Sequence, residues 1–174
     1  MTNYSHIYET VVHQFSQNLL ALKNILEKAK SHADYMKYDV NTFLTMKLAP
    51  DMFPFLKQVQ MTTDNAKGAA SRLAGKENPV FTDDEKTMDD LIKRVEKTIN
   101  YLEGFKENDF ADYKNKKITF PWYPGKSLDG NTYFYSYAIP NFYFHLTTSY
   151  DLIRQAGVAI GKNDYLGNIQ WKNN

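Results

Sequence analysis

The 174-residue sequence contains no cysteine. This absence excludes disulfide bonds, thiolate metal sites, iron–sulfur clusters and cysteine nucleophiles. Arginine occurs only three times, and 21 basic residues against 20 acidic ones leave a net charge of +1. Because nucleic-acid binding depends on clustered cations that meet phosphates, we expect no nucleic-acid partner.

Long hydrophobic runs are also absent. No apolar stretch approaches the roughly 18–20 residues that a membrane-spanning helix requires, so we expect no membrane association. Residues 1–6 have neither the basic nor the apolar region of a signal peptide. These observations predict a soluble cytoplasmic protein, and the length fits one domain covering residues 1–174.

Glycine and proline are missing from the first 49 residues, where a regular apolar stripe is present. The stripe has the spacing of one face of an α-helix. It predicts a first helix that ends near Lys30, where the pattern is lost. The stripe consists of Ile7, Val11, Phe15, Leu19, Leu22, Leu26 and Ala29.

A second helix is predicted from Asp51, a suitable N-cap residue, to Gly75, which suits the left-handed position after a helix. A third helix is predicted to begin at a capping box formed by Thr82 and Glu85. The link between these two helices is short, which favours an antiparallel pair. The longer connections on either side allow crossovers.

Helical periodicity disappears between residues 108 and 139 and returns in a fourth helix that begins at Pro140. Residues 118–120 and 133–135 have the composition of short strands, separated by glycine-containing loops. The predicted fold is therefore all-α: a four-helix bundle with a small β-ribbon or irregular insertion between the third and fourth helices.

Polar residues on the second and fourth helices form the candidate site. Asn141 and His145 are separated by one helical turn and share a face, while Asp51 and Gln58 lie on one flank of the second helix. If these helices pack together, the four side chains converge as the polar groups of a ligand site. The alternative is that His145 is satisfied by a neighbouring hydroxyl or carbonyl group.

The insertion and the fourth helix supply aromatic residues that can form the apolar walls of such a site. The candidates are Trp122, Phe120 and Tyr143. A mostly apolar cleft with a few polar groups is the usual form of a small-molecule site. The same aromatic richness, from Phe105 to Tyr150, is also compatible with a protein–protein interface.

Several strings resemble a domain-of-unknown-function family within the DinB/YfiT-like four-helix bundles, which has bacterial and fungal members. They are residues 48–54 (LAPDMFP), 58–60 (QVQ), 70–75 (ASRLAG), 140–145 (PNFYFH) and 157–162 (GVAIGK). The resemblance covers nearly the whole chain. It implies a bundle fold and a homodimer.

The resemblance also implies a metal position. Many DinB-like proteins hold a divalent metal on three histidines, which fall on Gln58, Asn141 and His145 in this sequence. Only one of the three is histidine here, and neutral amide oxygens are weak ligands. We therefore predict a degenerate metal site with no cofactor, and keep a bound divalent metal, Zn or Ni, as the alternative.

Three functions follow from these observations. The first is a bundle protein with a degenerate metal site that binds a small molecule between its second and fourth helices, or acts structurally. The second is a metal-dependent DinB-like enzyme, such as a hydrolase, isomerase or thiol transferase. The third is an interaction module that uses its aromatic surface.

Overall fold

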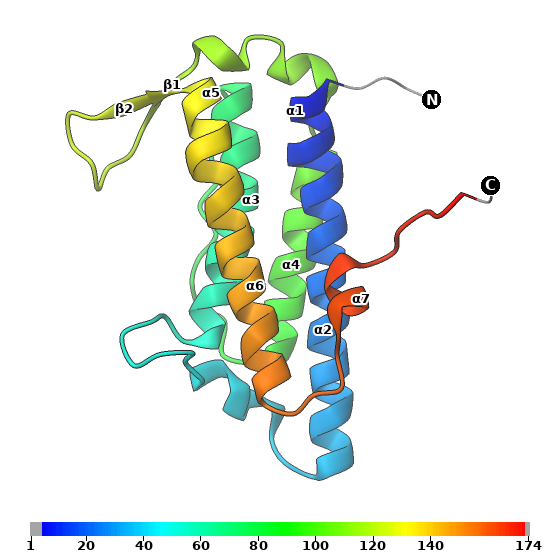
Figure 1. Cartoon of the computed structure of the whole chain (residues 1–174). Helices are drawn as coiled ribbons and strands as arrows, with labels where there is room; N and C mark the ends of the chain where they lie inside the picture. The colour runs from blue at the N-terminus through cyan, green and yellow to red at the C-terminus, as the bar shows by residue number, and fades with distance from the viewer. Residues whose placement is uncertain (1–4, 173–174) are drawn as a thin grey trace.

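Four long helical rods form the molecule in a computed structural model that describes residues 5–172 (Figure 1). The first rod runs through α1 (His6–Tyr8), the π-helical turn η1 (Glu9–Gln14) and α2 (Phe15–Met36). The second and third rods are α3 (Phe55–Ala74) and α4 (Met88–Glu103). The last rod joins α5 (Gly130–Tyr133), the π-helical turn η5 (Phe134–Ala138) and α6 (Ile139–Gln155). The predicted all-α bundle with a small β insertion is confirmed.

The connections complete the chain. Short 3₁₀ helices η2 (Val40–Thr45), η3 (Glu107–Phe110) and η4 (Tyr113–Asn115) lie at the two ends of the bundle. Strands β1 (Lys117–Thr119) and β2 (Ser127–Asp129) form an antiparallel ribbon in which Ile118 faces Leu128. The ribbon projects from one end of the bundle (Figure 1), and α7 (Lys162–Leu166) packs on α2.

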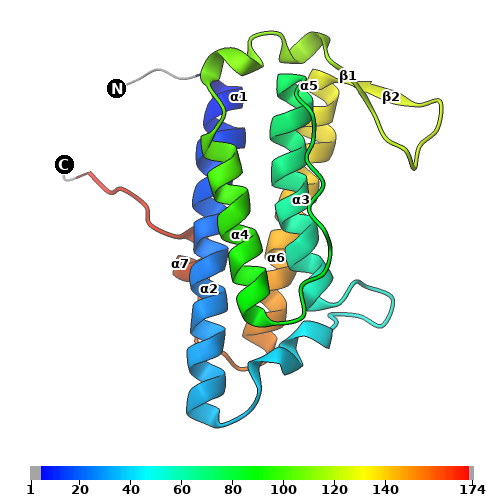
Figure 2. The same cartoon turned by 180° about the vertical axis from the view of Figure 1, so that it is seen from behind.

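The direction of α4 differs from the prediction. Thr63 lies beside Arg94, and Ser71 lies beside Tyr101, so residue numbers rise together and α3 and α4 are parallel. Residues 75–87 run back along α3 to the opposite end of the bundle (Figure 2). Extended chain spans up to about 3.3 Å per residue, whereas the 20-residue α3 is only about 30 Å long. The link that we expected to force an antiparallel turn is thus long enough to cross the bundle.

Two predicted helix starts also differ. Helix α3 begins at Phe55 with Pro54 as its N-cap, so Asp51 lies in the exposed turn before the helix. Helix α4 begins after Thr87, whose hydroxyl accepts from the Asp90 backbone N–H while the Asp90 carboxylate accepts from the Thr87 N–H. The capping box is therefore five residues later than predicted, because Thr82 and Glu85 belong to the crossover.

Helix α2 continues beyond the predicted end. It reaches Met36 and is closed by Lys37, whose φ of 60° is left-handed. Ala29 and Ala33 are buried four residues apart. The apolar stripe therefore continues to Ala33. Because the neighbours of this small residue in the sequence are polar, the stripe is hard to recognise there.

Residues 133–135 are helical instead of forming a strand. Asp129 caps this last rod by accepting from the Thr132 backbone N–H at 2.9 Å. Tyr133 and Phe134 then point into the core. Pro140 does not begin the helix but lies within it, two residues after the end of η5, where the wider π-helical turn accommodates a residue without a backbone donor.

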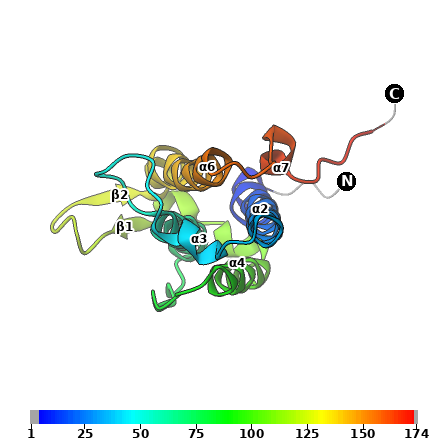
Figure 3. The same ribbon diagram turned by 90° about the horizontal axis from the view of Figure 1, so that it is seen from below.

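The view along the bundle places α3 between α6 and α4, with α2 completing the square (Figure 3). A single cluster of buried apolar side chains from all four rods fills the centre. Among residues 5–172, none of the helices is both long and apolar enough to cross a bilayer.

Candidate functional site

The second and fourth predicted helices do bring Gln58 and His145 together. Imidazole Nδ1 lies 2.7 Å from Gln58 Oε1, and the two residues are only 5% and 1% exposed. Gln58 Nε2 donates to the Phe53 carbonyl oxygen at 3.1 Å. Its Oε1 is thus the acceptor, and His145 Nδ1 carries the donated proton.

Burial controls the charge of this histidine. Removal from water disfavours the imidazolium form and lowers the pKa of His145 to about 4. Its partner Gln58 is neutral and does not offset that effect. His145 is therefore uncharged at neutral pH.

Asn141 forms a separate pair instead of joining Gln58. Its Nδ2 donates to Asn65 Oδ1 at 2.8 Å, and Asn65 Nδ2 in turn donates to the Met61 carbonyl oxygen at 2.7 Å. The predicted single polar cluster is thus two side-chain pairs on the α3–α6 interface. Both pairs follow from the antiparallel course of these two helices (Figure 1).

Two other predicted residues lie elsewhere. Asp51 lies in the exposed turn before α3. Tyr143 faces α2, where its hydroxyl donates to Asn18 Oδ1 at 3.0 Å. Burial raises the pKa of Tyr143 to about 12. The Tyr143 ring therefore contributes to helix packing against α2.

The donors at the predicted metal positions do not fit a tight divalent site. Gln58 Oε1 and His145 Nδ1 are directed at each other, and the Asn141 amide bonds to Asn65. Tight Zn²⁺ and Ni²⁺ sites prefer imidazole, thiolate or carboxylate ligands. Across the described part of the chain, no three histidine, aspartate or glutamate side chains are grouped so that they could hold a metal.

A cleft of about 490 Å³ adjoins the Asn65–Asn141 pair. It lies where α3, the crossover segment, the base of the β-ribbon and the last rod meet. Its lining residues are Met61, Asp64, Asn65, Lys67, Arg72, Asn78, Pro79, Val80, Phe81, Asp83, Phe120, Trp122, Tyr137 and Asn141.

Aromatic side chains form one wall of the cleft. The Phe120 ring centroid lies 5.0 Å from that of Trp122 and 4.9 Å from that of Tyr137. Trp122 is 58% exposed, so much of its ring is open to solvent. Two predicted wall residues, Phe120 and Trp122, are thus brought together with one predicted polar residue, Asn141.

Three charged residues of the cleft lining, Asp64, Lys67 and Asp83, belong to a charge network that includes Arg94. Arg94 is 3% exposed and contacts Asp64 at 3.0 Å, Asp83 at 3.1 Å and Glu85 at 2.8 Å. Lys67 lies 3.1 Å from Asp64, and desolvation lowers the pKa of the Lys67 ammonium group. These ion pairs attach the crossover segment to α3 and α4.

The periodicity of the sequence did not reveal this network, although one signal was present. Arg94 falls within the apolar stripe of α4, beside Leu91 and Val95. A cation in a buried stripe needs carboxylate partners. Glu85, predicted as part of a capping box, is one of those partners, and Asp83 is another.

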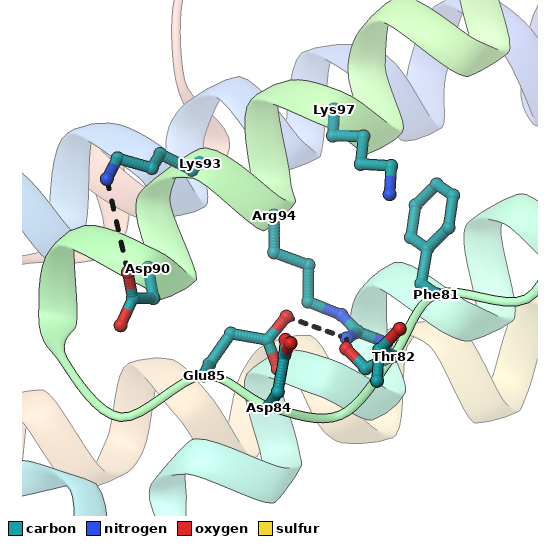
Figure 4. A pocket seen from close by; sticks show the side chains of 8 residues that line it. All are labelled: Phe81, Thr82, Asp84, Glu85, Asp90, Lys93, Arg94 and Lys97. Carbon is teal, nitrogen blue, oxygen red and sulfur yellow. Dashed lines mark hydrogen bonds and ion pairs between the residues drawn. The ribbon is translucent and has the colours of Figure 1, made fainter.

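A second hollow, of about 410 Å³, lies on the outer side of the same network (Figure 4). Lys97 Nζ lies 4.0 Å from the centroid of the Phe81 ring, and the Arg94–Glu85 ion pair forms the floor. Charged side chains dominate this hollow, whereas aromatic rings line the first.

The fold defines this molecule as a DinB-like four-helix bundle. The family model described as "Domain of unknown function (DUF1993)" matches residues 7–166, and the chain belongs to that family. The chain is also similar to a solved DinB family member from Shewanella denitrificans, with 40% identity and a TM-score of 0.92. That match covers 96% of this chain and 95% of the other. A search of the curated proteins found no match.

Proposed function

We propose that this protein binds a small molecule in the cleft between α3 and α6. The observation that carries the proposal is the meeting of an aromatic wall with a side-chain amide pair in one cleft. The volume, about 490 Å³, lies in the roughly 300–1,000 Å³ range of small-molecule sites. Polar groups in such a cleft orient a ligand and give it specificity, and the aromatic rings supply apolar contact area.

Each side of the cleft has a different role in this proposal. The exposed ring of Trp122 offers a surface on which a planar ligand can stack. Asn141 Oδ1 accepts no hydrogen bond from the described residues, so it is free to accept one from a ligand. Asn65 orients that amide by accepting from Asn141 Nδ2.

The proposal includes a degenerate metal site. The His145–Gln58 pair occupies two of the three positions that the DinB-like resemblance assigns to metal ligands. A hydrogen bond between neutral groups supports a packing role there. For the alternative of a metal-dependent enzyme, the described residues provide no suitable donor set.

Tryptophan fluorescence tests the proposal directly. The chain has two tryptophans, Trp122 and Trp171. The variant Trp171→Phe keeps Trp122 as the sole reporter, and a fragment library is screened against it at fixed pH and salt. We expect a subset of planar fragments to shift or quench Trp122 emission with saturable titration curves.

The matched control is Trp122→Phe, which leaves Trp171 as the sole reporter. Fragments that bind the cleft leave the emission of this control unchanged. If no fragment gives a saturable Trp122 signal, or if every signal persists when Asn141→Leu blocks the cleft in a folded variant, the proposal is wrong.

A further inference from the structure

Arg72 differs from Lys67, the other cation in the cleft lining. Lys67 lies 3.1 Å from Asp64, while Arg72 forms no ion pair with any carboxylate of residues 5–172. The acidic residues of the cleft, Asp64 and Asp83, are both ion-paired with Arg94. The cleft therefore contains one guanidinium whose charge is not balanced by the protein.

The fold holds this guanidinium in place. Arg72 Nη1 donates to the Tyr133 hydroxyl at 3.4 Å, and the guanidinium carbon lies 5.2 Å from the Phe120 ring centroid. The side chain folds back over Gly68, where a Cβ atom would overlap Nη1. The missing side chain at Gly68 thus creates the space that Arg72 occupies.

We propose that the cleft binds an aromatic carboxylate, with Arg72 as the group that binds the anion. A guanidinium presents a planar fork of donors that matches a carboxylate. The ring of such a ligand then lies toward Trp122 and Phe120, which is the aromatic wall beside Arg72. This inference rests on the proposed function and names its ligand class.

A carboxylate suits the site better than a more highly charged anion. Arg72 is the one lining cation without a carboxylate partner among the described residues, because Lys67 bonds to Asp64 and to the Pro79 carbonyl oxygen. A single guanidinium balances a single negative charge. The other charged residues that line the cleft are already ion-paired, so no second free cation among the described residues balances further negative charge.

The test uses phenylacetate and its neutral analogue phenylacetamide, which have nearly the same shape. Both are titrated into the Trp171→Phe protein at low salt with Trp122 emission as the readout. Because charge-assisted hydrogen bonds are stronger than neutral ones, we expect phenylacetate to bind at least tenfold more tightly. In Arg72→Gln, this preference disappears while phenylacetamide affinity stays within twofold.

Two further variants separate binding from folding. Arg154→Gln is the matched control, since Arg154 Nη1 donates to the Val158 carbonyl oxygen outside the cleft; it keeps the preference. Gly68→Ala retains Arg72 but displaces its guanidinium, so the preference falls at least fivefold. Its melting temperature does not fall, because alanine favours a helix interior over glycine.

Equal affinity for phenylacetate and phenylacetamide in the unsubstituted cleft overturns the inference. So does a carboxylate preference that survives in Arg72→Gln. If neutral fragments alone shift Trp122 emission, the aromatic-carboxylate inference fails while the small-molecule proposal stands. If no planar fragment of any charge shifts it, both fail.

Discussion

Acidification should destabilise the protein through His145. Burial lowers the pKa of this side chain from 6.5 to about 4. Between these values the unfolded chain binds a proton that the folded chain does not. The free energy of unfolding therefore falls as the pH decreases from about 6.5 to about 4. Above pH 6.5 His145 is neutral in both the folded and the unfolded chain, so its full contribution to stability is present. Below pH 4 the histidine is protonated in both states and causes no further loss.

The size of the effect follows from the pKa difference. Each pKa unit corresponds to about 1.4 kcal/mol, so the full interval amounts to about 3 kcal/mol. The side chain is 5% exposed, and its partner is the neutral Gln58, so no opposite charge reduces this cost. A loss of this order is a large share of the roughly 5–15 kcal/mol that stabilises a typical domain.

Urea unfolding followed by circular dichroism at intervals between pH 7 and pH 4 measures the effect. Carboxylates also titrate in this range, so His145→Gln is measured in parallel. We expect the variant to lose about 3 kcal/mol less than the unsubstituted protein over the interval. Parallel stability profiles for the two proteins would refute the assignment of a buried, neutral histidine.

Three further substitutions test other parts of the structure. Arg94→Met leaves carboxylates without their buried partner and should lower the free energy of unfolding by about 3 kcal/mol. This is the lower end of the range for a broken buried pair, because the side chains of Asp64 and Asp83 are 30% and 40% exposed. Urea unfolding measures the loss, and a loss below ~1 kcal/mol would contradict the role of the network. Thr87→Ala should lower the free energy of unfolding by about 1 kcal/mol because it removes the cap of α4, whereas Thr82→Ala should be almost neutral. Thermal unfolding compares the two variants, and a larger loss of stability for Thr82→Ala would place the cap at Thr82 instead.

The packing of the long helices was predictable because apolar residues repeat at a regular spacing. The same spacing placed Gln58 and His145 on facing flanks, and the structure joins them at 2.7 Å. The spacing did not identify the partner of Asn141, because it shows only which face of a helix a residue lies on. Two polar residues of α3 lie on the facing flank, and the spacing does not distinguish between them. That partner is Asn65, seven residues after Gln58.

The charge network was not predictable from periodicity. Its geometry depends on the direction of the crossover segment, which carries Asp83 and Glu85 back along α3 to Arg94. An extended segment has no repeat that reveals its course. The expected homodimer and the absence of a nucleic-acid partner stay predictions, which light scattering and a gel-shift assay can test.

A crystal structure with the tightest-binding planar carboxylate from the fluorescence screen tests the central claim most directly. We predict electron density for the ligand in the α3–α6 cleft, with its ring against Trp122, its carboxylate at Arg72 and the Asn141 amide within hydrogen-bond distance. Density in the hollow beside Phe81 and Lys97 instead, with an empty α3–α6 cleft, would contradict the account.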